Sequence, residues 1–562
     1  MTQYSVARHA RPVGRPLRAL TQSLGAACTV FRNRDLARVE ISWAGSMCGE
    51  FLSIVAFGVY AYQAGGAAAV GLVAAIQLAP AALLAPVAAE LGDRFARERV
   101  VVGSEIVRAT AMALAATAVW THAPAAAVYI VAAVAGIATQ ALYPAQTGLV
   151  PLLARTAEEV TAASAASSLI RSAAGLLAPA VGGLLLLTGS IGTLFVACAL
   201  CFAAAVVVAA TIGGTSELRA APPSRGALRD VLAGFGAARE DRDIAVMLGI
   251  FAVHGISRGA LGVLLVIVPL ELLGLHDSSV GFFNAALGIG GIVGAVATAA
   301  MTGRRHLAAA VAAGLVLTGA PLMLAGAAAV TAWLLVCMAI VGVGITVVSA
   351  AGTVLLVRLA RDDVLARVLG VLGTLRAVAM TAGSLLAPLL AQFAGVRTTL
   401  VAVGAITPAA ALAARRALRR IDEDVTVHED ELRLLRGSPV FAPVHPVALE
   451  RLAARLRPFT VQAGTIVLNE GDAGDQVYLV AGGKLEVTWN DRTVNVIQAG
   501  EIFGEMALLH DEPRNATVTA REDARLYGLD KDEFLAAVIC HPSSSREIEN
   551  LISARLTRSG MV

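Results

Sequence analysis

The polar residues with the most specific spacing lie in the stretch FGEMALLHDEPRNATVTA, residues 503–520. Gly504 allows the backbone to come close to a bound group, and the free N–H groups of a short helix over 506–509 suit an anionic phosphate. Arg514, nine residues after Glu505, can return across this stretch to the phosphate with a charge-assisted hydrogen bond. The spacing therefore predicts a site for a phosphate.

Neighbouring residues complete this candidate site. Phe503 precedes the glycine, and Met506 and Ala507 lie in the expected short helix. Asn515 and Ala516 would offer backbone amides to the phosphate. The residues assigned to the site are Phe503, Gly504, Glu505, Met506, Ala507, Arg514, Asn515, Ala516 and Thr517.

The elements that must hold this site are short β-strands. From Phe441 onward, alternating Val, Ile, Leu and Tyr are interrupted by Glu-Gly-Asp, Gly-Gly and Ala-Gly. This pattern predicts an antiparallel barrel. Two helical stretches, 530–540 and 544–556, would pack after the barrel.

Two motifs in this segment resemble those of a known domain. NEGDAGDQVYLVAGGKLEV, residues 469–487, is similar to the glycine-turn signature of cyclic-nucleotide-binding domains of the catabolite activator and protein kinase regulatory subunit type. The stretch 503–520 is similar to their phosphate-binding cassette along its whole length. The resemblance covers 441–562 and implies an α+β domain built on a β-barrel.

The resemblance implies a regulatory ligand and no other cofactor. In a domain of this type Glu505 is placed to accept a hydrogen bond from a ribose hydroxyl. A cyclic phosphate carries one negative charge, which Arg514 alone can balance. At the position of Asn515 the cAMP-binding relatives commonly have Ala or Ser, and cGMP-selective relatives have Thr, so cAMP is favoured and cGMP stays open. The alternative is a barrel that has lost its ligand, although Glu505 and Arg514 are both present. An aliphatic cap over the base is expected from Ile548, Leu551, Ile552 and Leu556.

The rest of the chain has the composition of a membrane protein. Of 562 residues 57% are hydrophobic and 15% charged, whereas soluble domains average about a quarter charged residues. A helix needs roughly 20 apolar residues to cross the hydrocarbon core of a bilayer. Twelve such spans are expected near 39–61, 67–91, 100–121, 125–150, 160–187, 191–213, 244–272, 279–301, 307–328, 331–357, 366–391 and 396–414.

Arginine is concentrated in alternate connections between these spans, whereas AYQAGG, THAP and LTGSIG carry almost no charge. Positive charge stays on the cytoplasmic side. We therefore expect a multi-pass protein of the plasma membrane with both termini in the cytosol, beginning with a basic cytosolic tail over 1–36. The basic connections contain Arg94, Arg97 and Arg99; Arg155; Arg219 to Arg242; Arg304 and Arg305; Arg358 to Arg367; and Arg415 to Arg420.

The two halves of this region contain similar sequences. Residues 154–179 and 360–388 both begin with Ala-Arg and an acidic pair, contain an arginine inside the span and reach Leu-Leu-Ala-Pro. A six-plus-six repeat is typical of major facilitator transporters, with the substrate site between the halves near the bilayer midplane. The resemblance covers 37–416 and implies an all-α membrane domain of twelve helices, followed by a linker over 417–440.

Two short motifs support this resemblance. GDRFARER, residues 92–99, resembles the major facilitator loop motif GxLADRxGRR, with Asp93, Arg94 and Arg97 at its charged positions and Ala96 where glycine is usual. A charge relay from Asp93 to the opposite half would hold one access state, or the segment is only a short positive loop. GLLAPAVGG, residues 175–183, resembles the Gly-Pro-rich stretch of drug and siderophore exporters, and its small residues would allow helices to approach closely.

Charged residues inside the spans are further functional candidates because they are costly there. Glu50 could carry a coupling proton, pair with a cationic substrate, or form a fixed ion pair with one arginine. His254 is expected to be a hydrogen-bonded core residue, and Cys198 and Cys201 are expected to pack rather than bind metal. The candidates for transport are Glu50, Arg108, Arg171, Arg258 and Arg376.

The sequence favours a transporter over other classes of protein. Residues 441–562 have a net charge of −5, which argues against nucleic acid as a ligand. No catalytic triad, metal site or nucleotide-hydrolysing P-loop is evident, so neither an enzyme nor an ATP-driven pump is expected. We therefore expect a secondary active exporter of a small molecule, regulated by cytosolic cAMP. The alternative is a membrane-anchored cyclic-nucleotide receptor or scaffold without transport activity.

Overall fold

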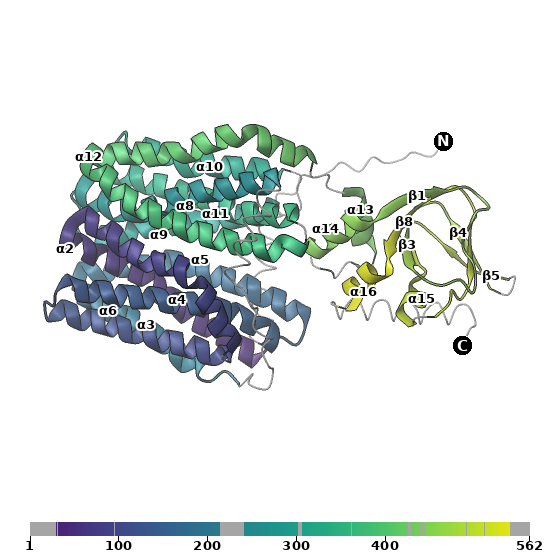
Figure 1. Cartoon of the computed structure of the whole chain (residues 1–562), viewed down its shortest axis with the longest axis horizontal. Helices are drawn as coiled ribbons and strands as arrows, with labels where there is room; N and C mark the ends of the chain where they lie inside the picture. Colours follow the sequence, from purple (N-terminus) through teal and green to yellow (C-terminus); the bar gives the residue numbers. More distant parts are fainter. Residues whose placement is uncertain are drawn as a thin grey trace, which may run out of the picture. The chain divides into compact units, whose positions relative to one another are not determined.

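A computed structural model describes most of the chain. It covers residues 30–94 without 31, then 96–213, 241–301, 306–360 and 362–424, and 429–539 apart from 439, 442–443, 445, 490–491 and 511. These residues form two compact units, a helical one up to Asp424 and a largely β-stranded one from there on (Figure 1). The expected succession of an all-α membrane domain and an α+β barrel domain is therefore present.

The first unit consists of long apolar helices. In the part of the chain that the structure describes, ten helices are long and apolar enough to cross a membrane. Local residues fix where some of them begin; Asp241, for example, caps α8 by accepting hydrogen bonds from the amides of Asp243 and Ile244. The helices are α2 Arg34–Arg94, α3 Arg97–Trp120, α4 Ala125–Leu153, α5 Ala157–Thr188, α6 Ile191–Ala209, α8 Arg242–Ile267 with the π-helical turn η1 Val268–Leu272, α9 Ser278–Met301, α10 Leu307–Ala325, α11 Thr331–Leu359 and α12 Asp362–Asp424.

Two of these helices are interrupted at glycines. In α2 the dihedral angles leave the helical region at Gly65 and Gly66, and the φ of Gly66 is 64°. In α12 they do so at Gly395, whose φ is 80°. The sequence predicts connections between spans at both places. Dividing α2 and α12 there gives twelve spans, a number that stays a prediction.

The helices pack mainly within two groups. In the first half, α2 and α3 both contact α4 and α6; in the second half, α12 contacts α8 and α10, and α11 contacts α9 and α10. The halves meet where α2 contacts α8 and α12. They also meet where α5 approaches α9, since a Cβ added to Gly183 would lie 2.7 Å from the carbonyl oxygen of Ser278. The GLLAPAVGG stretch thus makes the close helix approach that its small residues predict.

The second unit begins with helices and continues into strands. Helix α13, Glu429–Gly437, and α14, Pro446–Arg455, precede two four-stranded antiparallel sheets with the orders β1-β8-β3-β6 and β2-β7-β4-β5. The strands are β1 Arg457–Val461, β2 Ile466–Leu468, β3 Gln476–Gly482, β4 Leu485–Trp489, β5 Arg492–Ile497, β6 Ile502–Phe503, β7 Thr517–Ala520 and β8 Ala524–Asp530, with α15 Glu505–His510 after β6 and α16 Lys531–Ile539 after β8.

The two sheets share one apolar core. Val480 and Leu526 from one sheet and Leu485 and Val518 from the other are buried in the same cluster. The helices cover a second cluster, to which α13 contributes Leu432 and Leu435 and α16 contributes Phe534. Of the two helical stretches expected after the barrel, the first is α16, whereas 544–556 and the proposed aliphatic cap lie outside the described residues.

Candidate functional site

The phosphate cassette begins where strand β6 ends. Gly504 follows the strand with a φ of +84°, a conformation that side chains with a Cβ rarely adopt. A Cβ at this position would also lie 2.7 Å from Nη1 of Arg514. Glu505 then begins helix α15 and is 1% exposed. Glycine is therefore required at 504 both by the turn and by the nearby arginine.

Two main-chain carbonyl groups hold Arg514 in place. Its Nη1 donates to the oxygen of Gly504 and its Nη2 to the oxygen of Gln476, each over 2.7 Å. The side chain is 2% exposed, and the nearest carboxylate oxygen that it pairs with, on the exposed Asp475, is 3.8 Å from Nη2. The guanidinium is thus fixed before any ligand binds, as a preorganised anion site requires.

The glycine-turn motif and the cassette are joined through their main chains. The amide of Gly471 donates to the oxygen of Arg514, and the amide of Arg514 donates to the oxygen of Asp472, both over 2.8 Å. The amide of Glu470 donates to Oγ1 of Thr517 over 3.1 Å. The two motifs that sequence analysis identified separately, on the basis of resemblance, therefore form one structural unit around Arg514.

Arg514 is charged although it is buried, and one of its hydrogen-bond donors has no partner within the described chain. Nε of Arg514 is buried and has no hydrogen-bond partner among the described residues. Burial lowers the pKa of the guanidinium, and Tyr478, Asp475 and Glu505 counteract this shift; an arginine nevertheless stays protonated in a protein. Burial has the opposite effect on a phenol and raises the pKa of Tyr478. The Tyr478 ring stacks on Phe503 with ring centroids 5.2 Å apart. A buried cation with an unused donor suits a monoanionic phosphate.

The remaining cassette residues surround this arginine at different depths. Ala507 is buried, Met506, Ala516 and Thr517 are half-buried, and Asn515 is exposed. Sequence analysis missed Gln476, which acts through its main-chain carbonyl. No side-chain pattern reveals such a contact, although the residue lies within the glycine-turn motif.

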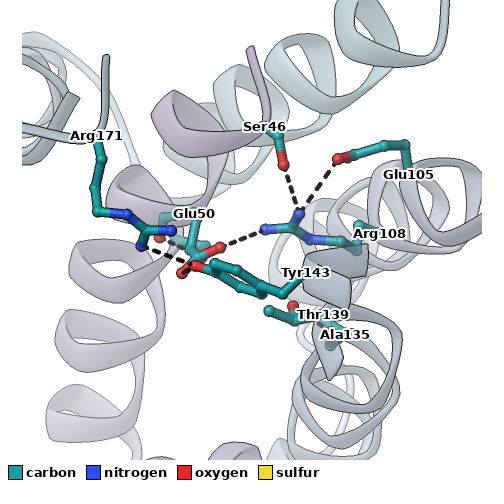
Figure 2. A network of polar contacts seen from close by, with 9 residues as sticks. Ser46, Glu50, Glu105, Arg108, Ala135, Thr139, Tyr143 and Arg171 are labelled. Atoms are coloured by element: carbon teal, nitrogen blue, oxygen red, sulfur yellow. Dashed lines mark hydrogen bonds and ion pairs between the residues drawn. The ribbon is translucent and has the colours of Figure 1, made fainter. Parts of the chain in front are cut away.

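A second polar cluster lies inside the first half of the membrane unit (Figure 2). Arg108 on α3 is 2% exposed and donates from Nη2 to Oε2 of Glu50 on α2 over 3.2 Å. Its Nη1 contacts Oγ of Ser46 at 2.8 Å and Oε1 of the fully buried Glu105 at 3.4 Å. Its guanidinium carbon lies 4.1 Å from the ring centroid of Phe202. One arginine thus pairs with two carboxylates.

The same cluster extends to helices α4 and α5. Tyr143 donates its hydroxyl proton to Oε1 of Glu50 over 2.8 Å, and Nη1 of Arg171 donates to the Tyr143 oxygen over 3.1 Å (Figure 2). Arg171 also lies 5.1 Å from the ring centroids of both Trp43 and Tyr143. Glu50, Arg108 and Arg171, chosen separately from the sequence, therefore belong to one network.

Sequence analysis missed two members of this network. Glu105 lies three residues before Arg108 in an otherwise apolar span, and this i, i+3 pairing of opposite charges could have identified it. Tyr143 is a polar residue beside Pro144 inside a span, which is a weaker signal.

The charged candidates of the second half lie apart from this network. Arg258 on α8 and Arg376 on α12 are half-buried, and the guanidinium carbon of Arg376 lies 5.7 Å from the ring centroid of Phe251. His254 is 2% exposed, as expected of a core residue. The expectation that it is hydrogen-bonded is wrong within the described structure, because neither of its ring nitrogens has a partner there.

The loop motif is described only in part. Arg97 donates from Nη1 to the main-chain oxygen of Gly148 on α4. The side chains of Asp93 and Arg94 lie outside the described residues, so the charge relay stays a prediction. Cys198 is fully buried in the apolar core of the membrane unit, where it packs as expected.

Family models match both units of the chain. The model described as Major Facilitator Superfamily matches residues 41–384 and 251–461. The model described as Cyclic nucleotide-binding domain matches residues 458–539. The chain therefore contains both domains, and the apolar helices belong to a multi-pass membrane protein.

Curated relatives match the C-terminal unit. The cAMP-dependent protein kinase regulatory subunit of Schizosaccharomyces pombe is 38% identical over 102 residues, which are 18% of this chain and 25% of that protein. A cyclic nucleotide-gated potassium channel of Rhizobium etli is 34% identical over 128 residues, 23% of this chain and 35% of the channel. The chain thus spans only about a quarter to a third of these relatives.

Among solved structures, the regulatory domain of Toxoplasma gondii PKA with cAMP is similar to the same unit. The identity is 34%, the match covers 20% of this chain and 44% of that one, and the TM-score is 0.19.

Proposed function

The chain belongs to the Major Facilitator Superfamily, and we propose that it is a secondary active transporter that exports a small molecule under the control of a cyclic nucleotide. The nucleotide, which we propose to be cAMP, would bind at the C-terminal unit. Both termini would lie in the cytosol, where cyclic nucleotides are made, and the membrane would be the plasma membrane.

The observation that carries regulation by nucleotide is the state of Arg514. A guanidinium that is 2% exposed, held by the carbonyl oxygens of Gly504 and Gln476, and left with an unused buried Nε is costly to keep without an anion. Glu505 is buried beside it at the start of α15, in position for a ribose hydroxyl. These groups fit a cyclic phosphate on a sugar.

The choice of cAMP and the direction of transport rest on other observations. The cAMP-dependent kinase subunit is among the relatives, and Asn515 is not the threonine that cGMP-selective relatives have. Export is supported by the resemblance of the GLLAPAVGG stretch to the Gly-Pro-rich stretch of drug and siderophore exporters.

Regulation requires that the nucleotide bind two states of the protein with different affinity, because equal affinity shifts nothing. The covalent connection from α12 to α13 offers a route by which a change in the C-terminal unit could reach the last membrane helices. In the membrane unit, the Glu50 network is the proposed site of proton coupling or of helix rearrangement, because it joins α2, α3, α4 and α5.

The first experiment is a calorimetric titration of the full-length protein in lipid nanodiscs with cAMP and with cGMP. We expect micromolar or tighter binding of cAMP that Arg514→Ala and Glu505→Ala abolish. Arg521→Ala, which changes an exposed arginine of the same unit, is the matched control. Failure of both nucleotides to bind would refute regulation through this site.

The second experiment measures transport in inside-out membrane vesicles. Accumulation of a panel of labelled anionic and cationic metabolites is compared with and without saturating cAMP, in the parent and in Arg514→Ala. Transport that cAMP changes only in the parent supports the proposal. Intact nucleotide binding without accumulation of any compound would favour the receptor or scaffold alternative.

A further inference from the structure

The equivalent arginines in the two halves of the membrane unit have different charged and polar neighbours. Arg171 on α5 and Arg376 on α12 occupy corresponding places in the sequence repeat. Arg171 donates to Tyr143, which donates to Glu50 (Figure 2). With Arg108 paired to Glu50 and Glu105, the first half contains two carboxylates and two guanidiniums within one network. Its charge is compensated internally.

The second half places basic side chains together without such compensation. Phe251, His254 and Arg258 follow one another at helical spacings along one face of α8, and Arg376 from α12 lies over the Phe251 ring. The main chains of the two helices are close at this point, because a Cβ added to Gly255, three residues before Arg258, would lie 3.5 Å from the main-chain oxygen of Arg376. Among the described residues no carboxylate forms an ion pair with either arginine. The local charge is therefore positive.

Buried polar atoms on the same helix lack partners. His254 is 2% and Ser257 1% exposed, yet both ring nitrogens of His254 and Oγ of Ser257 have no hydrogen-bond partner within the described chain. Buried polar groups in native proteins are nearly always satisfied. Within the described residues, His254 and Ser257 thus add unpartnered polar atoms to the same stretch of α8 that carries Arg258.

The surroundings argue that this region faces the interior of the bundle. Helix α8 is the most buried of the described spans, with 72% of its most apolar window buried. It packs closely on α12, because a Cβ added to Gly255 would lie 2.7 Å from Cβ of Ala379. Charged residues inside membrane proteins face the protein interior or a substrate path, where they pair with one another or with the transported molecule.

We propose that His254, Ser257, Arg258 and Arg376 bind the negatively charged group of the transported molecule, so that the substrate is a small organic anion carrying a carboxylate or a phosphate. This inference rests on the proposed transport function and specifies its substrate class. It also assigns Glu50 to the compensated network of the first half, so Glu50 does not serve as the partner of a cationic substrate.

The charge of the site can be measured without knowing the substrate. Ser257→Cys is introduced into full-length protein whose six native cysteines have been replaced by alanine, and the protein is reconstituted in nanodiscs. The new thiol is reacted with sulfonatoethyl methanethiosulfonate, an anion, and with its trimethylammonioethyl counterpart, a cation. The rate constant for each reagent is divided by the rate constant of the same reagent with a small free thiol, and the two resulting ratios are compared.

We expect the anionic reagent to be favoured by about tenfold or more, the lower end of electrostatic focusing in a charged cleft. Arg258→Gln with Arg376→Gln should abolish this preference, and the corresponding Lys variants should keep it. A preference for the cation, a preference that survives both Gln changes, or no reaction with either reagent would overturn the proposal.

A thermal unfolding measurement guards against variants that merely disturb the fold. Removing the two uncompensated charges of these half-buried arginines should raise the unfolding midpoint of the Gln variant, whereas loss of a structural ion pair would lower it. Neither measurement uses nucleotide or flux. A neutral site in a protein that still accumulates compounds would therefore refute only the anion inference, and an anion-selective site without any transport would refute only the transporter.

Discussion

Tyr143 donates its hydroxyl proton to Oε1 of Glu50 over 2.8 Å and so joins α4 to α2. The same oxygen of Tyr143 accepts a hydrogen bond from Arg171 on α5. A phenol is able to do both, because its oxygen is donor and acceptor at once. Tyr143 therefore bridges Arg171 and Glu50 through two hydrogen bonds.

Tyr143→Phe removes both hydrogen bonds of the hydroxyl while keeping the aromatic ring. We expect the free energy of unfolding to fall by about 1 kcal/mol, the usual net value of a hydrogen bond. Thermal unfolding in nanodiscs would show a lower midpoint. Tyr129→Phe, on the same helix, is the control. Equal midpoints for the two variants would mean that the Tyr143 hydroxyl contributes nothing.

Arg108→Leu leaves the carboxylate of Glu105, which is 0% exposed, without its cation. Breaking a buried ion pair from one side costs roughly 3–5 kcal/mol. Arg108→Leu with Glu105→Leu should recover part of this loss, because the unpaired charge of Glu105 is removed, whereas Glu50 keeps only its hydrogen bond from Tyr143. Unfolding of the two single variants and the double variant gives the coupling energy. Additive effects would contradict the pairing.

The sequence predicts the nucleotide cassette well because its contacts are local or belong to one family motif. Gly504, Glu505 and Arg514 lie within one short stretch, and the fold brings Arg514 back across it to the Gly504 carbonyl; its predicted contact with a phosphate stays a prediction. The contact of Arg514 with Gln476 spans 38 residues and uses the main chain, so no pattern of side chains could reveal it.

The membrane network is less predictable because its contacts are distant in sequence. Glu50 and Tyr143 are 93 residues apart. The cost of a charge inside the bilayer indicates that Glu50 needs a partner, but four arginines inside the spans could supply it. Only the packing of the helices selects Arg108 and, among the residues that the structure describes, leaves Arg258 and Arg376 without a carboxylate. For the same reason the sequence could not predict that His254 lacks a hydrogen-bond partner within the described chain.

Gly281→Ala tests the contact between the halves at α5 and α9. A Cβ at Gly281 would lie 2.5 Å from the amide nitrogen and 2.6 Å from Cα of Gly183. Because these are main-chain atoms, the helices must separate, at a cost of roughly 1–3 kcal/mol. Gly262→Ala, a helical position with no atom within 4 Å of the added Cβ, should instead be neutral or stabilising. Thermal unfolding of both variants distinguishes a tight contact from a general preference for glycine.

The last prediction separates backbone strain at the cassette from direct interference with Arg514. Gly500 and Gly504 both have positive φ angles, +91° and +84°. A Cβ at Gly500 meets nothing within 4 Å, whereas one at Gly504 lies 2.7 Å from Nη1 of Arg514. Alanine at either position should therefore cost roughly 1–2 kcal/mol of stability for the left-handed backbone.

Only Gly504→Ala should also displace the guanidinium and weaken cAMP binding, by about 100-fold if the charged contact is lost. Chemical unfolding and calorimetric titration of the full-length variants measure the two effects separately. If Gly500→Ala weakens binding as much as Gly504→Ala, strain in the barrel rather than the position of Arg514 controls the affinity. If neither variant changes binding, the arginine is not the phosphate ligand, because a displaced guanidinium cannot keep a contact that depends on the Gly504 carbonyl.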